Sequence, residues 1–312
     1  MYYISDLHEG DMINAIYFCK TKQSQQTKAG KTYFSMLLQD KTGVIDAKIW
    51  DLNNGIAHFD AMDYISVIAQ VVSFQGNLQL NVKQVRKAQE GEYHVADYMP
   101  CSSFNIDDMY KELTDLMKSV KDKYLNRLLQ NIFINDKEFA EKFKNHSAAK
   151  SIHHGFIGGL LQHTLAVAKL CDYYSLQYPI LNRDLLITAA ICHDIGKVDE
   201  LSEFPENDYT DEGQLIGHIV MGTMLLDGKM KEIEGFPVKL ANELKHCILA
   251  HHGELEYGSP KKPALAEAMA LNLADNADAK MQTLTELFKD KKGNDWLGYN
   301  RLFESNIRKT VI

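Results

Sequence analysis

The first 90 residues show the alternation of apolar and polar side chains that is typical of β-strands. Phe34, Met36 and Leu38, for example, occupy every second position of one run. Because successive side chains of a strand point to opposite faces, this period of two predicts strands with one buried face. Turn signals such as Gln75-Gly76-Asn77 separate the runs. The predicted strands are Met12–Cys19, Thr32–Leu38, Val44–Trp50, Tyr64–Phe74 and Leu78–Arg86.

Five strands in this order predict an OB-like barrel. The segment Asn53–Phe59 lies between the third and fourth strands, where a small Greek-key barrel can carry a short helix. Other five-stranded barrels share the pattern, so the OB-fold is the favoured assignment among several.

From about Asn105 onward, apolar residues recur at the spacing of amphipathic helices. Glycines at positions 196, 235 and 253 follow helical runs, where left-handed residues that end helices are expected. The segment 87–104 has few apolar residues and reads as a linker. The fold class is therefore a β barrel followed by an all-α part. The predicted helices are Asp107–Gln130, Asp136–Asn145, Ile157–Tyr178, Asp184–His193, Gly213–Lys231, Val238–His252 and Ala264–Lys289.

Charge and histidine are distributed unevenly along the chain. Residues 1–90 hold nine Lys/Arg and nine Asp/Glu, so the rest of the chain carries the whole net charge of −8. Nine of the twelve histidines lie between His146 and His252. An acidic, histidine-rich half indicates metal binding, whereas a neutral half with basic loops can still contact nucleic acid.

The five cysteines are scattered and form no C-x-x-C pair, which favours a reducing compartment over a disulfide framework. The N-terminal residues lack the basic and apolar regions of a signal peptide, and no apolar run approaches the roughly 20 residues that span a bilayer. We therefore expect a cytoplasmic protein that makes no contact with a membrane.

One set of side chains in the helical half has the composition of a metal site. Its members are spaced so that each predicted helix contributes one or two ligands. Imidazole and carboxylate together suit Mn²⁺, Fe²⁺, Co²⁺, Ni²⁺ or Zn²⁺. Asp194 has two oxygens and could bridge two such ions, which would lower the pKa of a shared water and hold the attacking and leaving oxygens of a phosphoryl transfer. The candidate ligands are His163, His193, Asp194, His218, His251, His252 and Asp275.

Each of these residues could also be an ordinary side chain with no role in metal binding. A single His-Asp dipeptide occurs often by chance, and most histidines on helices are surface or satisfied core residues. The ordered set of candidates, each on its own helix, is what favours a metal site. Lys197, one helical turn beyond His193, is expected to neutralise a phosphate oxygen, so that Asp194 and Lys197 are the expected catalytic residues. The histidines interpreted as ordinary are His8, His58, His94 and His246.

The helical half resembles the HD-domain phosphohydrolases over roughly residues 150–285. The similar motifs are Leu160–Thr164, Cys192–Lys197, Gly217-His218, Ala250–Gly253 and Ala274–Lys280. Lys28–Asp51 is similar to the OB signature of YhaM-type 3′-to-5′ exoribonucleases, which combine a barrel with an HD domain. The resemblance implies an OB-fold nucleic-acid-binding domain at 1–90, a linker and helical connector at 91–150, an HD domain at 151–290 and a C-terminal tail at 291–312.

The resemblance also implies how the ligands divide between two metals, with Mn²⁺ the expected ion. The first metal would be held by His163, His193, Asp194 and Asp275, and the second by Asp194, His218 and His251. His252 is an additional candidate, and Asp278 competes with Asp275; we prefer Asp275 because it follows the apolar run. His153 and His154 resemble the entry to the first HD helix, where they either line the substrate path or cap the helix.

The barrel carries candidate contacts to a single strand. The segment Lys20–Lys31 contains four lysines and no acid, and we expect it to be a loop beside the binding face. Aromatic platforms with nearby lysines hold single strands without reading sequence. The alternative is that Trp50 covers a barrel end and the lysines only solubilise the loop. The expected substrate-binding residues here are Lys28, Lys31, Tyr33, Lys48 and Trp50.

With the resemblance, these observations predict a metal-dependent 3′-to-5′ exoribonuclease that releases nucleoside 5′-monophosphates from single-stranded RNA. Single-stranded DNA is a further candidate substrate, since nothing in the sequence reads the 2′-hydroxyl. One rival is an HD phosphohydrolase of small or cyclic nucleotides, although no Gly-Tyr-Pro run follows His251-His252. Another is a non-enzymatic single-strand-binding protein with a degenerate HD domain. The sequence leaves open whether the chain forms a homo-oligomer.

Overall fold

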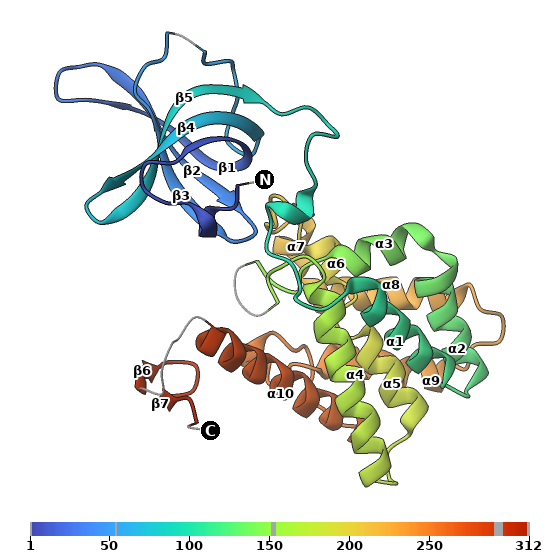
Figure 1. Ribbon diagram of the computed structural model, residues 1–312. Helices are drawn as coiled ribbons and strands as arrows, with labels where there is room; N and C mark the ends of the chain where they lie inside the picture. The colour runs from blue at the N-terminus through green and yellow to red at the C-terminus, as the bar shows by residue number, and fades with distance from the viewer. Residues whose placement is uncertain (1, 54, 151–153, 290–295, 311–312) are drawn as a thin grey trace.

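The computed structural model describes residues 2–53, 55–150, 154–289 and 296–310, and it contains a closed five-stranded barrel followed by a helical half (Figure 1). The strand order around the barrel is β1-β2-β3-β5-β4. Neighbouring strands are antiparallel except β3 and β5, which pair in parallel and close the barrel. The strands are β1 (Met12–Gln26), β2 (Thr32–Asp40), β3 (Gly43–Ile49), β4 (Tyr64–Phe74) and β5 (Asn77–Lys87). The predicted OB-like architecture is confirmed.

The barrel core follows the alternation read from the sequence. Met36 and Leu38 on β2 and Ile45, Ala47 and Ile49 on β3 are all buried. They pack in one apolar cluster with side chains from the other three strands. The period of two therefore identified the inward face correctly.

Two expectations about the barrel loops are wrong. Of the described residues between 53 and 59, none is helical: Gly55 takes a positive φ of 73°, and Ile56 forms a bridge with Val85 of β5. This bridge holds the segment extended, so it cannot wind into a helix. The lysine-rich segment is mostly strand, because β1 continues to Gln26 and pairs with β2 from Phe18 to Gln26. Only residues 27–31 remain as a turn.

The helical half contains the seven predicted helices, two of them divided, and also short helices at 131–135, 197–200 and 255–257 that the sequence did not predict. Asp122 caps a new helix by accepting from the amides of Tyr124 and Leu125, which splits the first predicted helix. Gly217, with a φ of 78°, splits the predicted helix 213–231. The helical elements are α1 (Ile106–Lys118), α2 (Lys123–Gln130), η3 (Asn131–Asn135), α3 (Lys137–Asn145), α4 (Gly159–Gln177), α5 (Arg183–Cys192), α6 (Lys197–Glu200), α7 (Asp211–Ile216), α8 (His218–Lys231), α9 (Val238–Ala250), η4 (Leu255–Tyr257) and α10 (Ala266–Lys289).

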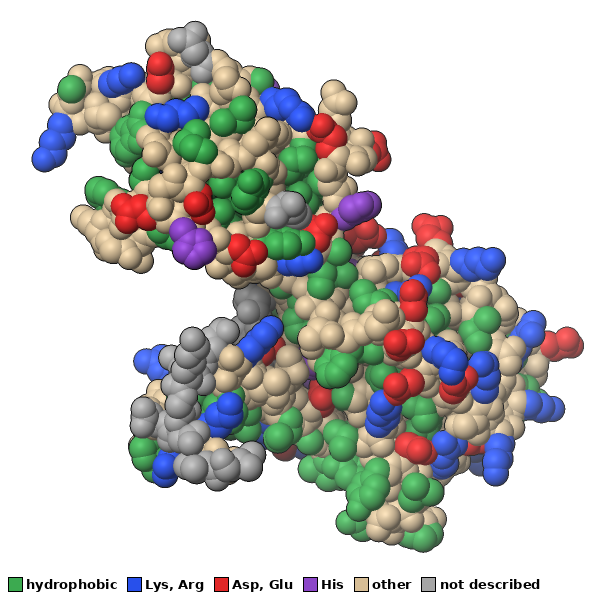
Figure 2. Space-filling view, viewed as in Figure 1, with side chains coloured by type: hydrophobic (Ala, Val, Ile, Leu, Met, Phe, Trp, Pro, Cys, Tyr) green, Lys and Arg blue, Asp and Glu red, His purple; other side chains and the backbone are tan. Residues whose placement is uncertain are grey.

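Helices α4, α5, α9 and α10 pack around one apolar core, to which α1, α2 and α3 also contribute. Helix α5 is buried from Leu185 to Cys192, so the residues that follow it emerge in the middle of the helical half. On the face shown in Figure 2, acidic and basic side chains are mixed over this half. Among the described residues, no helix combines the length and hydropathy needed to cross a bilayer.

The barrel is joined to the helical half through an apolar cluster. Phe18 of β1 and Tyr64 of β4 pack with Tyr98, Met99 and Ile157. Cys101 and Ile157 also form a parallel bridge, which fixes the chain that connects the two halves. Near the C-terminus lies a hairpin that the sequence did not predict, β6 (Trp296–Asn300) with β7 (Ser305–Arg308).

Candidate metal centre

The seven candidate ligands come from five places in the helical half and meet in its interior. His163 lies on α4 and Asp275 on α10, while His193 and Asp194 directly follow α5. His218 begins α8, and His251 and His252 follow α9. The ends of α5 and α9 and the start of α8 thus point their polar side chains at one another.

A first group consists of His163, His193 and Asp275, whose ligand atoms all lie within 4.8 Å of one another. The Nε2 atoms of the two histidines are 3.1 Å apart. Asp275 Oδ1 is 3.2 Å from His163 Nε2 and 4.0 Å from His193 Nε2. Two nitrogens and an oxygen that converge in this way can hold one divalent ion.

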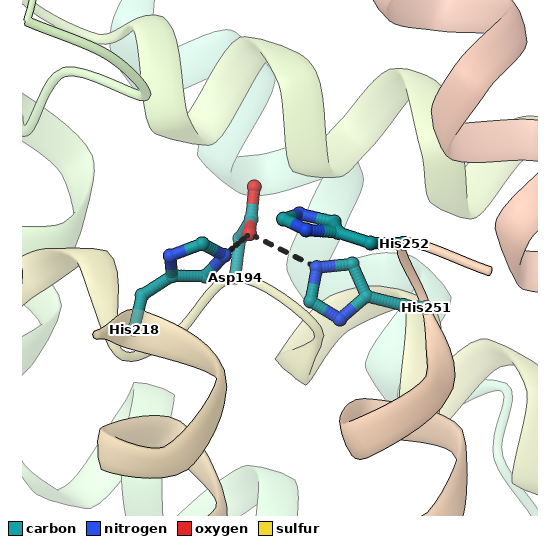
Figure 3. A group of neighbouring side chains, drawn as sticks. All are labelled: Asp194, His218, His251 and His252. Carbon is teal, nitrogen blue, oxygen red and sulfur yellow. Dashed lines mark ion pairs between the residues drawn. The ribbon is translucent and has the colours of Figure 1, made fainter. Parts of the chain in front are cut away.

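A second group consists of Asp194, His218, His251 and His252 (Figure 3). Asp194 Oδ1 lies 3.4 Å from His218 Nε2 and 3.6 Å from His251 Nε2, as the dashed lines mark. All three atoms are buried and have no hydrogen-bond partner among the described residues. Buried polar atoms without partners are costly, so their convergence fits a ligand set for a cation.

Asp194 faces both groups. Its Oδ1 belongs to the second group, and its Oδ2 lies 3.5 Å from His163 Nε2 and 3.4 Å from His193 Nε2 of the first. Lys197 Nζ is 2.8 Å from the same Oδ2. A carboxylate in this position can bridge two ions, while Lys197 offsets part of the negative charge.

Each of the five histidines has its other ring nitrogen held by an acceptor. The Nδ1 atoms of His193, His251 and His252 lie 2.7–2.8 Å from backbone carbonyls. A nitrogen that donates to a carbonyl leaves Nε2 unprotonated in the neutral ring, which is the form that binds metal. Because His251 and His252 share this arrangement, the geometry leaves both as candidate ligands.

Asp275 and Asp278 occupy different positions around His163. Asp275 faces its Nε2, on the side of the first group, whereas Asp278 Oδ2 lies 2.7 Å from its Nδ1. Asp278 also accepts from His154 Nε2 at 3.0 Å. This geometry favours Asp275 as the ligand and makes Asp278 the group that orients His163.

Glu200 is a member of the centre that sequence reasoning missed. Its Oε1 lies 2.9 Å from His218 Nδ1 and accepts from the backbone amide of His218 at 2.9 Å. It sits on α6, only three residues after Lys197, but acidic residues are too common near helices for this one to stand out. Its pairing with His218 depends on how α8 packs on α6.

Burial and the surrounding charges shift several pKa values in the centre. Burial alone would lower the pKa of His163, but Asp275 and Asp278 outweigh it and raise the pKa to about 10, so a metal ion that binds its Nε2 would displace a proton there. Burial would raise the pKa of Asp194, yet Lys197 and His193 hold it well below its usual range. Burial lowers the pKa of His251, which favours the neutral ring. The carboxylates therefore keep their negative charge, and so the centre stabilises a positive charge that is placed among them.

Gly196 has a role other than the expected one. Glycines 235 and 253 have the predicted left-handed φ, but Gly196 has a φ of −70° and is right-handed. A Cβ at Gly196 would lie 2.1 Å from the carbonyl oxygen of His218. Glycine is required here because the start of α8 packs directly against this backbone, which brings His218 next to Asp194.

His153 lies outside the described residues, and His154 is buried against Asp278. His154 lines a pocket of about 380 Å³ that also includes His163, Lys197, His252 and Asp275. The pocket gives the metal centre an open side. His246 accepts from the amide of Ala264 at 2.9 Å, away from the centre, as the interpretation of an ordinary histidine implies.

The barrel residues predicted to hold a strand are only partly grouped. Tyr33 and Trp50 stack with ring centroids 4.5 Å apart, and Trp50 is 41% exposed. Lys48 lies on β3, two residues before Trp50, but pairs with Asp46 at 2.8 Å, so its charge is already balanced. Lys28 and Lys31 are exposed in the turn between β1 and β2.

This arrangement of histidines and aspartates on a helical scaffold defines an HD-domain protein. Residues 160–280 match the family model of the HD domain. The chain is 32% identical to the 3′-5′ exoribonuclease YhaM of Geobacillus sp. (strain WCH70), over 97% of this chain and 94% of that protein. It is 34% identical to the protein of the same name from Bacillus velezensis, over 88% of this chain and 87% of that protein. The chain belongs to the YhaM family of 3′-to-5′ exoribonucleases.

Among solved structures, the chain is similar to the second OB-fold domain of replication protein A from Methanococcus maripaludis. The likeness has 20% identity and a TM-score of 0.24, over 30% of this chain and 98% of that one.

Proposed function

We propose that this protein hydrolyses single-stranded RNA from its 3′ end and releases nucleoside 5′-monophosphates at a centre of two divalent metals. The observation that carries the proposal is the position of Asp194, whose two oxygens face two separate groups of ligands. Membership of the YhaM family supports the substrate and the direction of cleavage.

The donor set fits two divalent ions. His163, His193 and Asp275 offer ligands on one side of Asp194, and His218 and His251 on the other. Imidazole mixed with carboxylate suits Mn²⁺, which we propose as the working ion, and also Fe²⁺, Co²⁺, Ni²⁺ and Zn²⁺. When bound, such ions supply Lewis-acid activation of water and phosphate.

The chain's own residues would position the ligands and the substrate. Glu200 and Asp278 hold His218 and His163 in the required tautomer and orientation. Lys197 lies beside Asp194 in the pocket, from which its ammonium can stabilise negative charge on a phosphate. The barrel, with the Tyr33–Trp50 stack, would hold the strand upstream of the cleaved end.

The test is digestion of 5′-labelled single-stranded RNA with Mn²⁺ by the wild type, Asp194→Ala and Asp115→Ala. Asp115 is an exposed aspartate on α1 and serves as the matched control. We expect a ladder that shortens from the 3′ end with the wild type and the control, and intact RNA with Asp194→Ala. Single-stranded DNA of the same sequence, run in parallel, tests whether the 2′-hydroxyl matters.

Equal cleavage by a folded Asp194→Ala variant would refute the proposed centre. Intact RNA together with hydrolysis of cyclic or polyphosphate nucleotides would instead identify a small-molecule phosphohydrolase.

A further inference from the structure

The pocket beside the metal centre has one aromatic wall. Tyr257 of η4 lines this pocket together with Lys197, His252 and Asn276. Alanines 148, 149 and 279 also line it, and their small side chains leave space. The pocket thus combines a charged part, suited to phosphate, with an apolar part of the kind that accommodates a flat ring.

The Tyr257 side chain itself is free to make a contact. It is 67% exposed although it belongs to the pocket lining. Among the described residues, its hydroxyl forms no hydrogen bond and its ring stacks on no other ring. A tyrosine in such a position offers a large flat face at a low cost in conformational entropy.

The backbone of Tyr257 is tied to the metal centre. Its carbonyl oxygen lies 2.7 Å from His252 Nδ1, and its amide donates to the carbonyl of Glu254 at 3.1 Å. Gly258 follows with a φ of 87°, which ends the short turn. The ring is therefore presented on a segment whose position is fixed relative to a candidate ligand.

We infer that Tyr257 forms a nucleobase-binding subsite, in which its ring stacks on the base of the 3′-terminal nucleotide while Lys197 and the metal centre face the adjacent phosphate. This inference rests on the proposed exoribonuclease function. Stacking tolerates every base, since each has a flat face. A base must leave its duplex partner and its stacked neighbours to reach Tyr257, so the subsite selects a single-stranded 3′ end.

The test compares Tyr257→Ala, Tyr257→Trp and the wild type on two RNAs that differ only in whether the 3′-terminal nucleotide carries a base or is abasic. Leu255→Ala is the matched control, because Leu255 is 60% exposed on the same turn and is not part of the pocket lining. The readouts are kcat and KM for release of the terminal nucleotide, and bound Mn²⁺ per chain.

On the normal RNA, we expect Tyr257→Ala to raise KM about tenfold with little change in kcat, because stacking is worth the same before and during the reaction. Leu255→Ala should behave as the wild type, and Tyr257→Trp, which keeps a flat ring, should restore most of the KM that is lost in Tyr257→Ala. On the abasic RNA, the KM of the wild type should rise by about the same factor, whereas the KM of Tyr257→Ala should not rise further. Bound Mn²⁺ should be equal in all variants.

Three results would overturn the inference while the wild type still degrades RNA. One is an unchanged KM in Tyr257→Ala. The second is an equal loss on both RNAs, and the third is a loss of bound Mn²⁺; either would mean that Tyr257 acts only by supporting His252. Absence of RNA degradation by the wild type would instead refute the proposed function itself.

Discussion

Asp278 accepts from Nδ1 of His163 at 2.7 Å, on the side of the ring opposite Asp275. The same oxygen lies 3.0 Å from Nε2 of His154, so this one carboxylate holds two buried histidines. These contacts outweigh burial, which alone would raise the pKa of Asp278, and lower it to about 2. The carboxylate is therefore charged under all ordinary conditions and fixes the ring that faces the first ligand group.

Asp278→Asn should weaken Mn²⁺ binding at the first group by about 10- to 100-fold, the usual effect of removing a group that orients a metal ligand. Asp275→Asn should weaken Mn²⁺ binding more than this, because Asp275 faces Nε2 of His163 directly. Calorimetric titration with Mn²⁺ measures both, with Asp115→Asn as the control. If Asp278→Asn bound Mn²⁺ as tightly as the wild type, the orienting role would be wrong.

Gly196 and Gly228 provide a matched pair of substitutions to alanine. A Cβ at Gly196 would collide with the backbone of His218, whereas one at Gly228 of α8 meets nothing within 4 Å. We expect Gly196→Ala to lower the free energy of unfolding by about 3 kcal/mol and to displace His218. Gly228→Ala should raise it by about 0.5–1 kcal/mol, since alanine favours helices.

Urea denaturation of the metal-free proteins measures both changes. Equal stability of the two variants would contradict the close packing of α8 on Gly196.

Much of the barrel and the list of candidate ligands could be predicted from the sequence, because both depend on local spacing. The alternation around Met36 and Leu38 reports directly which side of a strand is buried. The candidate ligands could be named because each has a residue type that binds metal and lies on or next to a predicted helix.

What could not be predicted depends on contacts between distant segments. Glu200 gains its role only when α8 places His218 beside it, and Gly196 is constrained by the same approach. The ion pair between Lys48 and Asp46, two residues earlier on β3, likewise depends on how the side chains lie, and the contact of Lys48 with a nucleic-acid strand stays a prediction. The extended course of residues 55–59 is set by the bridge between Ile56 and β5, and the local sequence pattern does not predict this bridge.

The Tyr33–Trp50 stack and the paired Lys48 give opposite expectations for RNA binding. Trp50→Ala should weaken binding of single-stranded RNA about tenfold, as the loss of a stacking platform does. Lys48→Met should change it less than about twofold, because Asp46 already balances the lysine charge. Fluorescence anisotropy with labelled RNA, in an Asp194→Ala background that prevents cleavage, measures both. A larger effect of Lys48→Met would show that the barrel binds mainly through phosphates.

The junction between the barrel and the helical half should lose stability at alkaline pH, because Tyr64 ionises there. Burial raises the pKa of Tyr64 to about 12, and that of Tyr98 to about 12 as well. An unfolded tyrosine ionises near pH 10. The folded state therefore binds more protons between these values, so the stabilisation is complete below about pH 10 and is lost as the pH rises toward 12.

Tyr64→Phe removes one of these ionisations together with a hydroxyl that has no hydrogen-bond partner among the described residues. We expect the variant to match the wild type in unfolding free energy at pH 8, because no hydrogen bond is lost. Between pH 10 and 11.5 it should lose less stability than the wild type. Urea denaturation at each pH, with Tyr2→Phe as an exposed control, measures the difference. Parallel curves for wild type and Tyr64→Phe would mean that Tyr64 ionises normally and that the junction is open to water.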